Sequence, residues 1–186
     1  MALGKTPTVD AIQWLPAEHL GQFTVDGRVR PWLIGSGLLT MRMKAVCGAA
    51  FSLRLVDQWS GLLSAAHQLA LRLPDDAGLL RDVELCHGDN VWVFEQTVIP
   101  DSTLCVHPWL AELGGSALGE TLSDLSGVER SSFEYAWLPA ADPVTARALR
   151  EADVKPDGLW ARRSRVSLRN APLLIQELFL PAMGCV

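Results

Sequence analysis

Two charged residues stand at positions where the pattern of the chain otherwise predicts the protein interior. If residues 173–179 form a β-strand, side chains alternate between its faces, and Glu177 shares one face with three large apolar side chains. The segment 79–85 has the same alternation, which places Arg81 on its apolar face. Burying an ionised side chain without a partner is costly, so each of these residues needs a counter-charge or a ligand.

The types of these two residues indicate what such a ligand would be. A guanidinium group presents a planar fork of N–H donors that suits a carboxylate, and a glutamate can accept a hydrogen bond from a hydroxyl group. One interpretation is therefore a buried site for a small hydroxylated anion. The other is that Arg81 and Glu177 neutralise each other as a buried ion pair, and the pattern alone leaves both open.

The cysteines and histidines form no metal or redox motif. The four cysteines and four histidines stand far apart, without the spacing of metal ligands. The chain also lacks the glycine-rich phosphate motifs and the Gly-x-Ser-x-Gly motif. We therefore expect a site without metal, little support for nucleotide-binding or esterase chemistry, and cysteines that are reduced and mostly buried.

Length and composition predict one globular domain, residues 1–186. Apolar residues make up 49% of the chain and charged residues 20%, which argues against disorder. No apolar run approaches the roughly 20 residues of a membrane span, so no stable membrane insertion is expected. No apolar segment follows Lys5, so a secretory signal is not indicated and we expect a cytoplasmic protein.

The charge of the chain argues against nucleic acid as a partner. The net charge is −5, whereas duplex binding needs a concentrated positive surface. In the one basic cluster, strand alternation places Arg163, Arg165 and Arg169 on one face and Arg162 on the other. We expect this cluster to be mainly a solvated strand face.

Antiparallel strands with helices between them are expected to position Arg81 and Glu177. The turn signals at 87–90 and at Asn170-Ala171-Pro172 each predict a hairpin that contains one of the two residues. The order of elements predicts an α+β fold with a single antiparallel β-sheet. The expected strands are 51–61, 79–85, 91–99, 128–138 and the hairpin 158–181, and the expected helices are 11–20, 31–46 with a break at 35–37, 116–124 and 143–152.

Two of the predicted helices begin after a serine. Ser36 and Ser116 are expected to cap helices that start near Leu39 and Leu118. The first backbone N–H groups of a helix have no partner within the helix, so both helix starts can bind an anion.

Three segments carry a family resemblance. They are GLWARRSRVSLRNAPLLIQELFLPA at 158–182, LLRDVELCHGDNVWVFEQTVIPDSTL at 79–104, and the pattern Leu-Gly-x-x-x-Leu-Gly at 113–119. In their order and spacing, these segments resemble the chorismate pyruvate-lyases, also called 4-hydroxybenzoate synthases.

The resemblance implies a monomeric, cofactor-free enzyme with helical flaps covering a buried ligand site. It implies a lyase that converts chorismate into 4-hydroxybenzoate and pyruvate, an early step of ubiquinone biosynthesis. By position, the resemblance makes Arg81 the residue that holds the ring carboxylate and Glu177 the residue that faces the ring hydroxyl, both catalytic. The backbone amides of Leu39 and Leu118 would complete the substrate-binding site.

Three features depart from the family pattern. Gln96 stands where family members have an arginine, and Gly115 stands where a lysine is frequent, so there is less positive charge to hold the second carboxylate of chorismate. Residues 139–157 have the composition of a surface insertion.

Two other functions remain open at this point. One is a non-enzymatic aromatic-acid-binding effector module, since effector modules of transcription regulators resemble this fold. The other is a chorismate-using enzyme that yields a different hydroxybenzoate.

Overall fold

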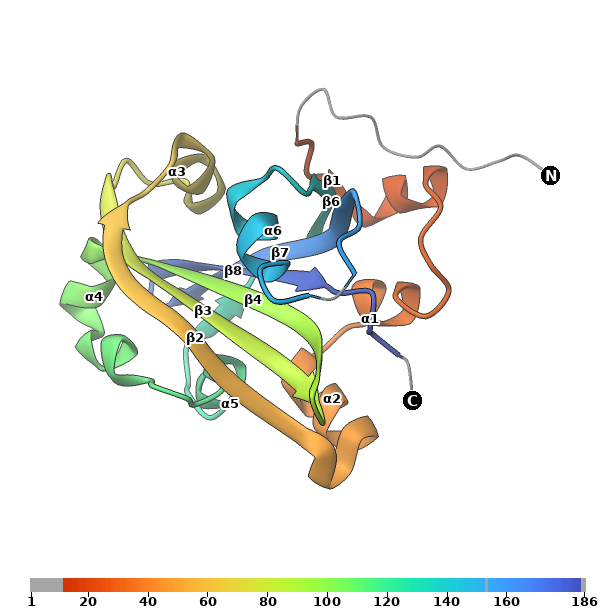
Figure 1. Ribbon diagram of the computed structural model, residues 1–186. Helices are drawn as coiled ribbons and strands as arrows, with labels where there is room; N and C mark the ends of the chain where they lie inside the picture. Colours follow the sequence, from red (N-terminus) through yellow and green to blue (C-terminus); the bar gives the residue numbers. More distant parts are fainter. Residues whose placement is uncertain (1–11, 153, 185–186) are drawn as a thin grey trace.

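The strands form one antiparallel sheet. A computed structural model describes residues 12–152 and 154–184 of the chain. Within these residues eight strands pair in the order β1-β6-β7-β8-β4-β3-β2, and β5 pairs with the end of β7 (Figure 1). The prediction of an α+β fold with a single antiparallel sheet is confirmed. The strands are β1 (Leu15–Pro16), β2 (Phe51–Leu62), β3 (Ala77–His87), β4 (Asn90–Pro100), β5 (Val128–Arg130), β6 (Glu134–Pro139), β7 (Gly158–Leu168) and β8 (Ala171–Phe179).

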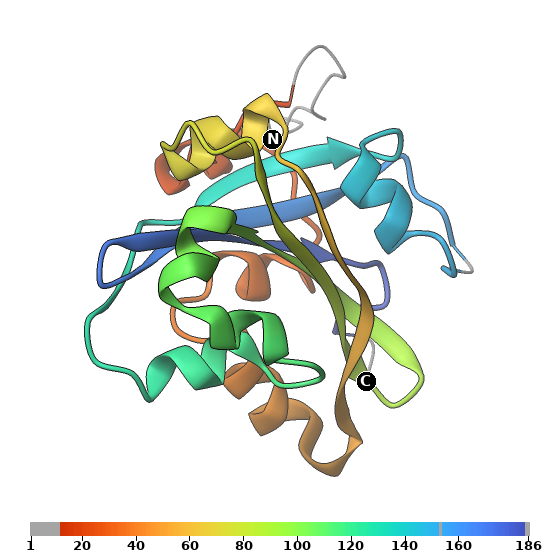
Figure 2. The same ribbon diagram turned by 90° about the vertical axis from the view of Figure 1, so that its left-hand side faces the viewer.

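Helices cover both faces of this sheet. In Figure 2 the yellow α3 lies above the sheet and the cyan α6 at its right-hand end, whereas the orange α2 and the blue-green α5 lie below the sheet. We call the side of α1, α2 and α5 the inner face and the side of α3 and α6 the outer face. The helices are η1 (Ala17–Gln22), α1 (Arg30–Ile34), α2 (Leu39–Cys47), η2 (Gly48–Ala50), α3 (Ala65–Leu71), α4 (Asp101–Val106), η3 (Pro108–Glu112), α5 (Leu118–Ser123) and α6 (Pro143–Ala148), where η denotes a 3₁₀ helix.

The core of the inner face consists of two separate apolar clusters. At one end of the sheet Leu33 and Met43, from α1 and α2, pack with Val83 of β3. At the other end Leu110 and Leu118, from η3 and α5, pack with sheet residues of the second cluster. The strands between these clusters carry polar side chains, so the two helical layers flank a polar region.

The central strands are buried along almost their whole length. Between their end residues β3 and β4 are buried at nearly every position, because helices cover both of their faces. The edge strand β2 is largely exposed by contrast. A charged side chain on β3, β4 or β8 is therefore removed from water on whichever face it lies.

Both predicted hairpins form, with one shift. β3 and β4 are joined at the predicted turn, where Gly88 has a φ of 57°. The β7–β8 turn lies at Arg169 and Asn170, whose φ angles are 48° and 71°, and not at Asn170-Ala171-Pro172. A two-residue hairpin turn needs positive φ at its central residues, which asparagine tolerates well, so β8 already begins at Ala171.

Some predicted helix features differ from the structure. The predicted helix 11–20 is instead the short strand β1 followed by η1, and Ala11 lies outside the described residues. Leu38 and Ala117, and not Ser36 and Ser116, are the N-cap residues of α2 and α5, and neither provides a side-chain cap. The expected surface helix exists as α6, with Pro143 in its first turn.

Two further observations concern the described residues. No helix among them is long and apolar enough to cross a membrane. Cys47 and Cys86 are buried as predicted and Cys105 is exposed, all three as free thiols, while Cys185 and the start of the chain with Lys5 lie outside the described residues.

Candidate active site

Two rows of residues cross the inner face between the apolar clusters. In the first row Arg162 of β7 is the cross-strand partner of Glu177 of β8, which in turn is the partner of Glu95 of β4. In the second row, two positions along each strand, Arg81 of β3 is the partner of Thr97 of β4. Side chains two residues apart on a strand share a face, so both rows point to the same side. We call these residues, together with Arg130 and Ser164, the polar belt.

Arg162 holds Glu177 in a buried ion pair. Its Nε donates to Oε2 of Glu177, and its Nη2 donates to Oε1 at 3.2 Å. Neither side chain is exposed to any appreciable extent. The bidentate arrangement satisfies the charge of Glu177 and fixes the orientation of its carboxylate.

Arg162 also binds the C-terminal end of α1. Its Nη1 donates to the carbonyl oxygens of Trp32, Leu33 and Gly35, the last of them at 2.8 Å. These carbonyls lie at the C-terminal end of α1, where helical carbonyl groups lack partners within the helix. One buried arginine thus joins the end of α1 to the carboxylate of Glu177.

Arg81 is fully buried but only partly hydrogen-bonded. Its Nη2 donates to the carbonyl oxygens of Gly114 and Ser116, each at 2.8 Å, which ties β3 to the loop before α5. Its Nε and Nη1 have no partner among the described residues, and neither has Oγ1 of the neighbouring Thr97. Unsatisfied buried polar atoms are rare and costly, so this cation and hydroxyl group mark a position where a ligand would supply acceptors.

The structure does not contain the Arg81–Glu177 ion pair that the sequence left open. The partner of Glu177 is Arg162, and β4 lies between the strands that carry Arg81 and Glu177. Both residues nevertheless lie on the inner face, as the alternation predicted. The guanidinium of Arg81 keeps unsatisfied donors because no carboxylate neutralises it directly.

Leu39 and Leu118 occupy the first positions of α2 and α5, which we call the flap helices. Their side chains are buried in the two different apolar clusters, and Leu38 lies against Gly119, so the helix starts are neighbours. Leu118 follows directly on the loop whose carbonyls bind Arg81. The predicted role of their backbone amides as ligand contacts stays a prediction.

Four residues of the polar belt were not singled out by the sequence: Glu95, Thr97, Arg130 and Ser164. Glu95 is buried, and burial first and then the Glu177 carboxylate raise its pKa to about 7, against the opposing effect of Arg81, Arg130 and Arg162. Arg130 donates to Oγ of Ser164 at 3.0 Å. The alternation of 91–99 could have identified Glu95, because it shares its face with Val93 and Ile99.

Arg162 was assigned to the correct face but interpreted as part of a solvated cluster. Its exposed fraction is 0%, whereas Arg169 in the turn is exposed. Arg163, on the outer face, donates to Glu134 at 2.8 Å and lies over the ring of Trp14. The sequence signal was that Arg162 alternates with Trp160 and Val166, an otherwise apolar face.

Gln96 lies on the outer face and is therefore not part of the polar belt. Its Nε2 donates to Oδ1 of Asp82 at 2.9 Å, and Arg147 of α6 donates to Oδ2 of Asp82 at 2.7 Å. We expected Gln96 to leave less positive charge for binding a second carboxylate. This expectation is wrong, because Gln96 follows Glu95 on the strand and therefore points to the opposite face. Gly115 does lie near the belt, between the two residues whose carbonyls bind Arg81.

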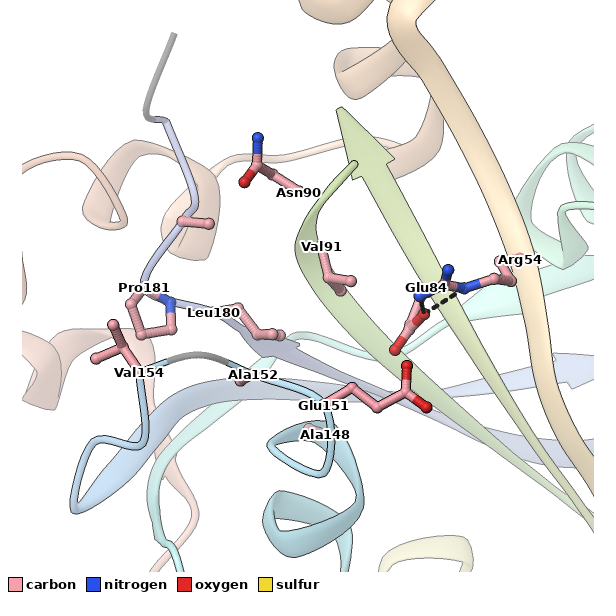
Figure 3. A pocket seen from close by; sticks show the side chains of 11 residues that line it. Arg54, Glu84, Asn90, Val91, Ala148, Glu151, Ala152, Val154, Leu180 and Pro181 are labelled. Carbon is pink, nitrogen blue, oxygen red and sulfur yellow. Dashed lines mark hydrogen bonds and ion pairs between the residues drawn. The ribbon is translucent and has the colours of Figure 1, made fainter. Parts of the chain in front are cut away.

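A cavity on the outer face differs from the polar belt because two charged residues that line it are already paired. It measures about 380 Å³ and lies between α6, β3 and the residues after β8 (Figure 3). The charges that line it include Arg54 and Glu84, which already form an ion pair at 2.5 Å. The inner face, where Nε and Nη1 of Arg81 and Oγ1 of Thr97 have no partner among the described residues, is the better candidate for a site. No group of three potential metal ligands occurs among the residues that the structure describes.

Comparison with known proteins identifies a family over almost the whole chain. The model of the family described as chorismate lyase matches residues 8–183. A probable chorismate pyruvate-lyase of Pseudomonas aeruginosa is 36% identical over 91% of this chain and 92% of its own length. A chorismate pyruvate-lyase of Erwinia tasmaniensis is 32% identical over 95% of this chain and 90% of its own length.

Solved structures share the fold at low sequence identity. The effector domain of PhnF from Mycobacterium smegmatis has a TM-score of 0.55 at 18% identity, over 80% of this chain and 91% of that domain. A GntR-family transcriptional regulator from Bacillus cereus has a TM-score of 0.54 at 9% identity, over 72% of this chain and 93% of that chain. These similarities concern the fold alone.

Proposed function

The chain belongs to the chorismate lyase family, and we propose that this lyase converts chorismate into 4-hydroxybenzoate and pyruvate at the polar belt. The proposal includes a role early in ubiquinone biosynthesis, in the cytoplasm, for a monomeric enzyme without a cofactor. The observation that carries the proposal is the pair of unpartnered N–H donors on buried Arg81, beside the unpartnered hydroxyl of Thr97.

Arg81 is proposed to bind the ring carboxylate of the substrate. Its available N–H donors are on Nε and Nη1, and each can donate a hydrogen bond to a carboxylate oxygen. The backbone N–H groups at Leu118 and Leu39, at the starts of the flap helices, would donate to the same carboxylate. A carboxylate bound there would satisfy groups that are otherwise buried without partners.

Glu177 is proposed to accept a hydrogen bond from the ring hydroxyl. Arg162 fixes the Glu177 carboxylate, so little reorganisation is needed when charge shifts in the substrate. Loss of the enolpyruvyl ether and of the neighbouring ring hydrogen leaves an aromatic ring, which drives the reaction. The protein then contributes by holding the reactive conformer and by excluding water.

Entry of the substrate would require movement of the flaps. A cavity of about 580 Å³ lies at the surface between α2, β2 and α5, next to the loop that binds Arg81. An ion pair between Lys44 of α2 and Glu120 of α5, at 2.7 Å, joins the two flap helices at this cavity. We propose that this is the side on which the site opens.

The decisive experiment is an incubation of the purified protein with chorismate. Pyruvate would be measured with lactate dehydrogenase, and the aromatic acid would be identified by chromatography against the hydroxybenzoate isomers. Equal amounts of pyruvate and 4-hydroxybenzoate are expected. A different isomer would contradict the proposed product.

A non-enzymatic function is the second candidate, because the fold is shared with an effector domain. Tight binding of 4-hydroxybenzoate by a protein that releases no pyruvate from chorismate would favour that candidate.

A further inference from the structure

The polar belt contains a second carboxyl group that the proposed function does not use. Glu95 is 8% exposed and lies directly across from Glu177, on the strand between Glu177 and Arg81. Side chains of directly opposite residues have Cβ atoms about 5 Å apart. No hydrogen bond or ion pair within the described residues engages the Glu95 carboxyl group, so it is an unpartnered polar group aimed into the ligand site.

The two carboxyl groups differ in their surroundings. Glu177 accepts two hydrogen bonds from Arg162, so both of its carboxylate oxygens are engaged by a guanidinium group. Glu95 has no such donor, and burial together with the charge of Glu177 raises its pKa to about 7. Two neighbouring carboxyl groups, one bound by a guanidinium group and one without such a partner, are suited to act as a base and an acid.

The charged groups around Glu95 come from every strand of the belt. Arg81 on β3, Arg130 on β5 and Arg162 on β7 favour its ionised form, and Glu177 on β8 favours its neutral form. From the flap above, Arg42 of α2 interacts electrostatically with Arg162 and Glu177. The arginines cannot serve as acids themselves, because a guanidinium does not release its proton in proteins.

We propose that Glu95 is a second catalytic residue, the acid that protonates the departing ether oxygen of the substrate. In this step Glu177 takes the ring hydrogen as a proton, and the electron pair of that C–H bond forms the new ring double bond. The bond between the ring carbon and the ether oxygen breaks, and its electron pair goes to the oxygen, which receives the proton of Glu95. The products are 4-hydroxybenzoate and the enol of pyruvate, which tautomerises to pyruvate.

The same geometry restores the starting state. After the step Glu177 carries a proton and Glu95 is ionised, and the two groups are direct cross-strand neighbours. Transfer of one proton from Glu177 to Glu95 resets both. This inference rests on the proposed function, since it assigns a role in the cleavage of chorismate.

The test compares E95Q with wild type and with E84Q across pH 5.5 to 9. Glu84 is the matched control, because it is also 8% exposed but lies on the outer face, paired with Arg54. For wild type and E84Q, kcat/KM should fall as pH rises above about 7, because the acid must be protonated. For E95Q, kcat/KM at pH 6.5 should be at least about tenfold lower, without the alkaline decline, and affinity for 4-hydroxybenzoate should change less than about threefold.

Infrared difference spectra provide a readout besides turnover. Wild type and E84Q should show a carbonyl band of a protonated carboxylic acid at pH 6 that disappears by pH 8.5, and E95Q should lack it. Suppose that the wild type is active but E95Q keeps the wild-type rate, the alkaline decline or the infrared band. That result would overturn the role of Glu95 and leave the proposed function intact. A wild type that releases no pyruvate would overturn the proposed function and this inference together.

Discussion

Arg81 carries a positive charge in the candidate site that no neighbouring carboxylate among the described residues pairs with directly. Burial lowers the pKa of its guanidinium, and Glu95 opposes this change, yet no carboxylate touches it. Its contacts with Gly114 and Ser116 occupy only one of its nitrogens. Binding of a carboxylate would therefore complete the coordination of a charge that the fold has already desolvated.

Replacing Arg81 with alanine should remove most of the affinity for aromatic carboxylates. We expect R81A to bind 4-hydroxybenzoate more weakly by about 2–5 kcal/mol, because a buried carboxylate loses its charged partner. Isothermal titration calorimetry measures this loss, and circular dichroism checks that the variant is folded. R150A, at an exposed arginine directly after α6 on the outer side of the sheet, is the control and should bind normally. Wild-type affinity in R81A would contradict the assignment.

Replacing Glu177 with glutamine should affect both stability and turnover. Arg162 would lose the negative charge of its buried partner, and breaking such a pair costs up to about 3–5 kcal/mol. Turnover per folded molecule should fall at least about tenfold, or ~1.4 kcal/mol of transition-state stabilisation.

Urea denaturation measures the stability of E177Q, and single-turnover kinetics at a known folded fraction measures its chemistry. An E177Q protein that unfolds early but reacts normally per folded molecule would restrict Glu177 to the ion pair with Arg162.

Helix α6 is attached to the outer face through one buried carboxylate. Asp82 is fully buried, and it accepts hydrogen bonds from Arg147 of α6 and from Gln96. Burial raises the pKa of Asp82, whereas Gln96 and Arg147 lower it. Arg147 also lies over the ring of Trp59, so it connects α6 to the edge strand β2. We propose that α6 supports β3 directly behind Arg81.

Removing Arg147 should destabilise the fold more than removing both members of this pair. R147M leaves Asp82 buried without its counter-charge, and we expect a loss of about 3–5 kcal/mol in the free energy of unfolding. D82N combined with R147M should recover part of that loss, because the buried charge is then absent. Chemical denaturation of the wild type and of the single and double variants forms the cycle. If D82N lowers the stability of R147M by as much as it lowers the stability of the wild type, the two residues act independently.

At the scale of the whole molecule, positive charge is concentrated where the substrate is negative. The chain carries a net charge of −5, yet the polar belt contains three arginines, Arg81, Arg130 and Arg162. These three guanidinium groups share the belt with two carboxyl groups, Glu95 and Glu177, and burial raises the pKa of Glu95 to about 7. Chorismate carries two carboxylates, and a neutral Glu95 leaves more positive charge in the belt to balance them in the proposed complex.

The free energy of unfolding should depend on the protonation of Glu95. Its pKa rises from 4.5 to about 7 on folding, so the folded state binds this proton more tightly than the unfolded state. Stability from this group is therefore fully present below pH 4.5 and is lost as pH rises through 7. The free energy of unfolding of E95Q relative to wild type should increase by up to about 3 kcal/mol between pH 5 and pH 8. Urea denaturation at several pH values measures this difference, and a constant difference would show that Glu95 is ionised throughout.

The sequence alone determined the features that depend on local periodicity. Alternation along 79–85 and 173–179 placed Arg81 and Glu177 on interior faces, and the turn signals placed both on hairpins of an antiparallel sheet. These inferences held because the two-residue period of a strand is a property of the backbone itself. Local signals were weaker at helix starts, where the helices begin near Leu39 and Leu118 but without the expected serine caps.

The tertiary structure alone decided which charged groups meet. Arg162 and Glu177 are 15 positions apart in sequence, and only the β7–β8 register makes them partners. The strand β4 separates Glu177 from Arg81 and brings Glu95 between them, and its depth beneath the flaps raises the pKa of Glu95. Pairing and desolvation depend on the register between strands and on the layers above them, which periodicity within one strand does not encode.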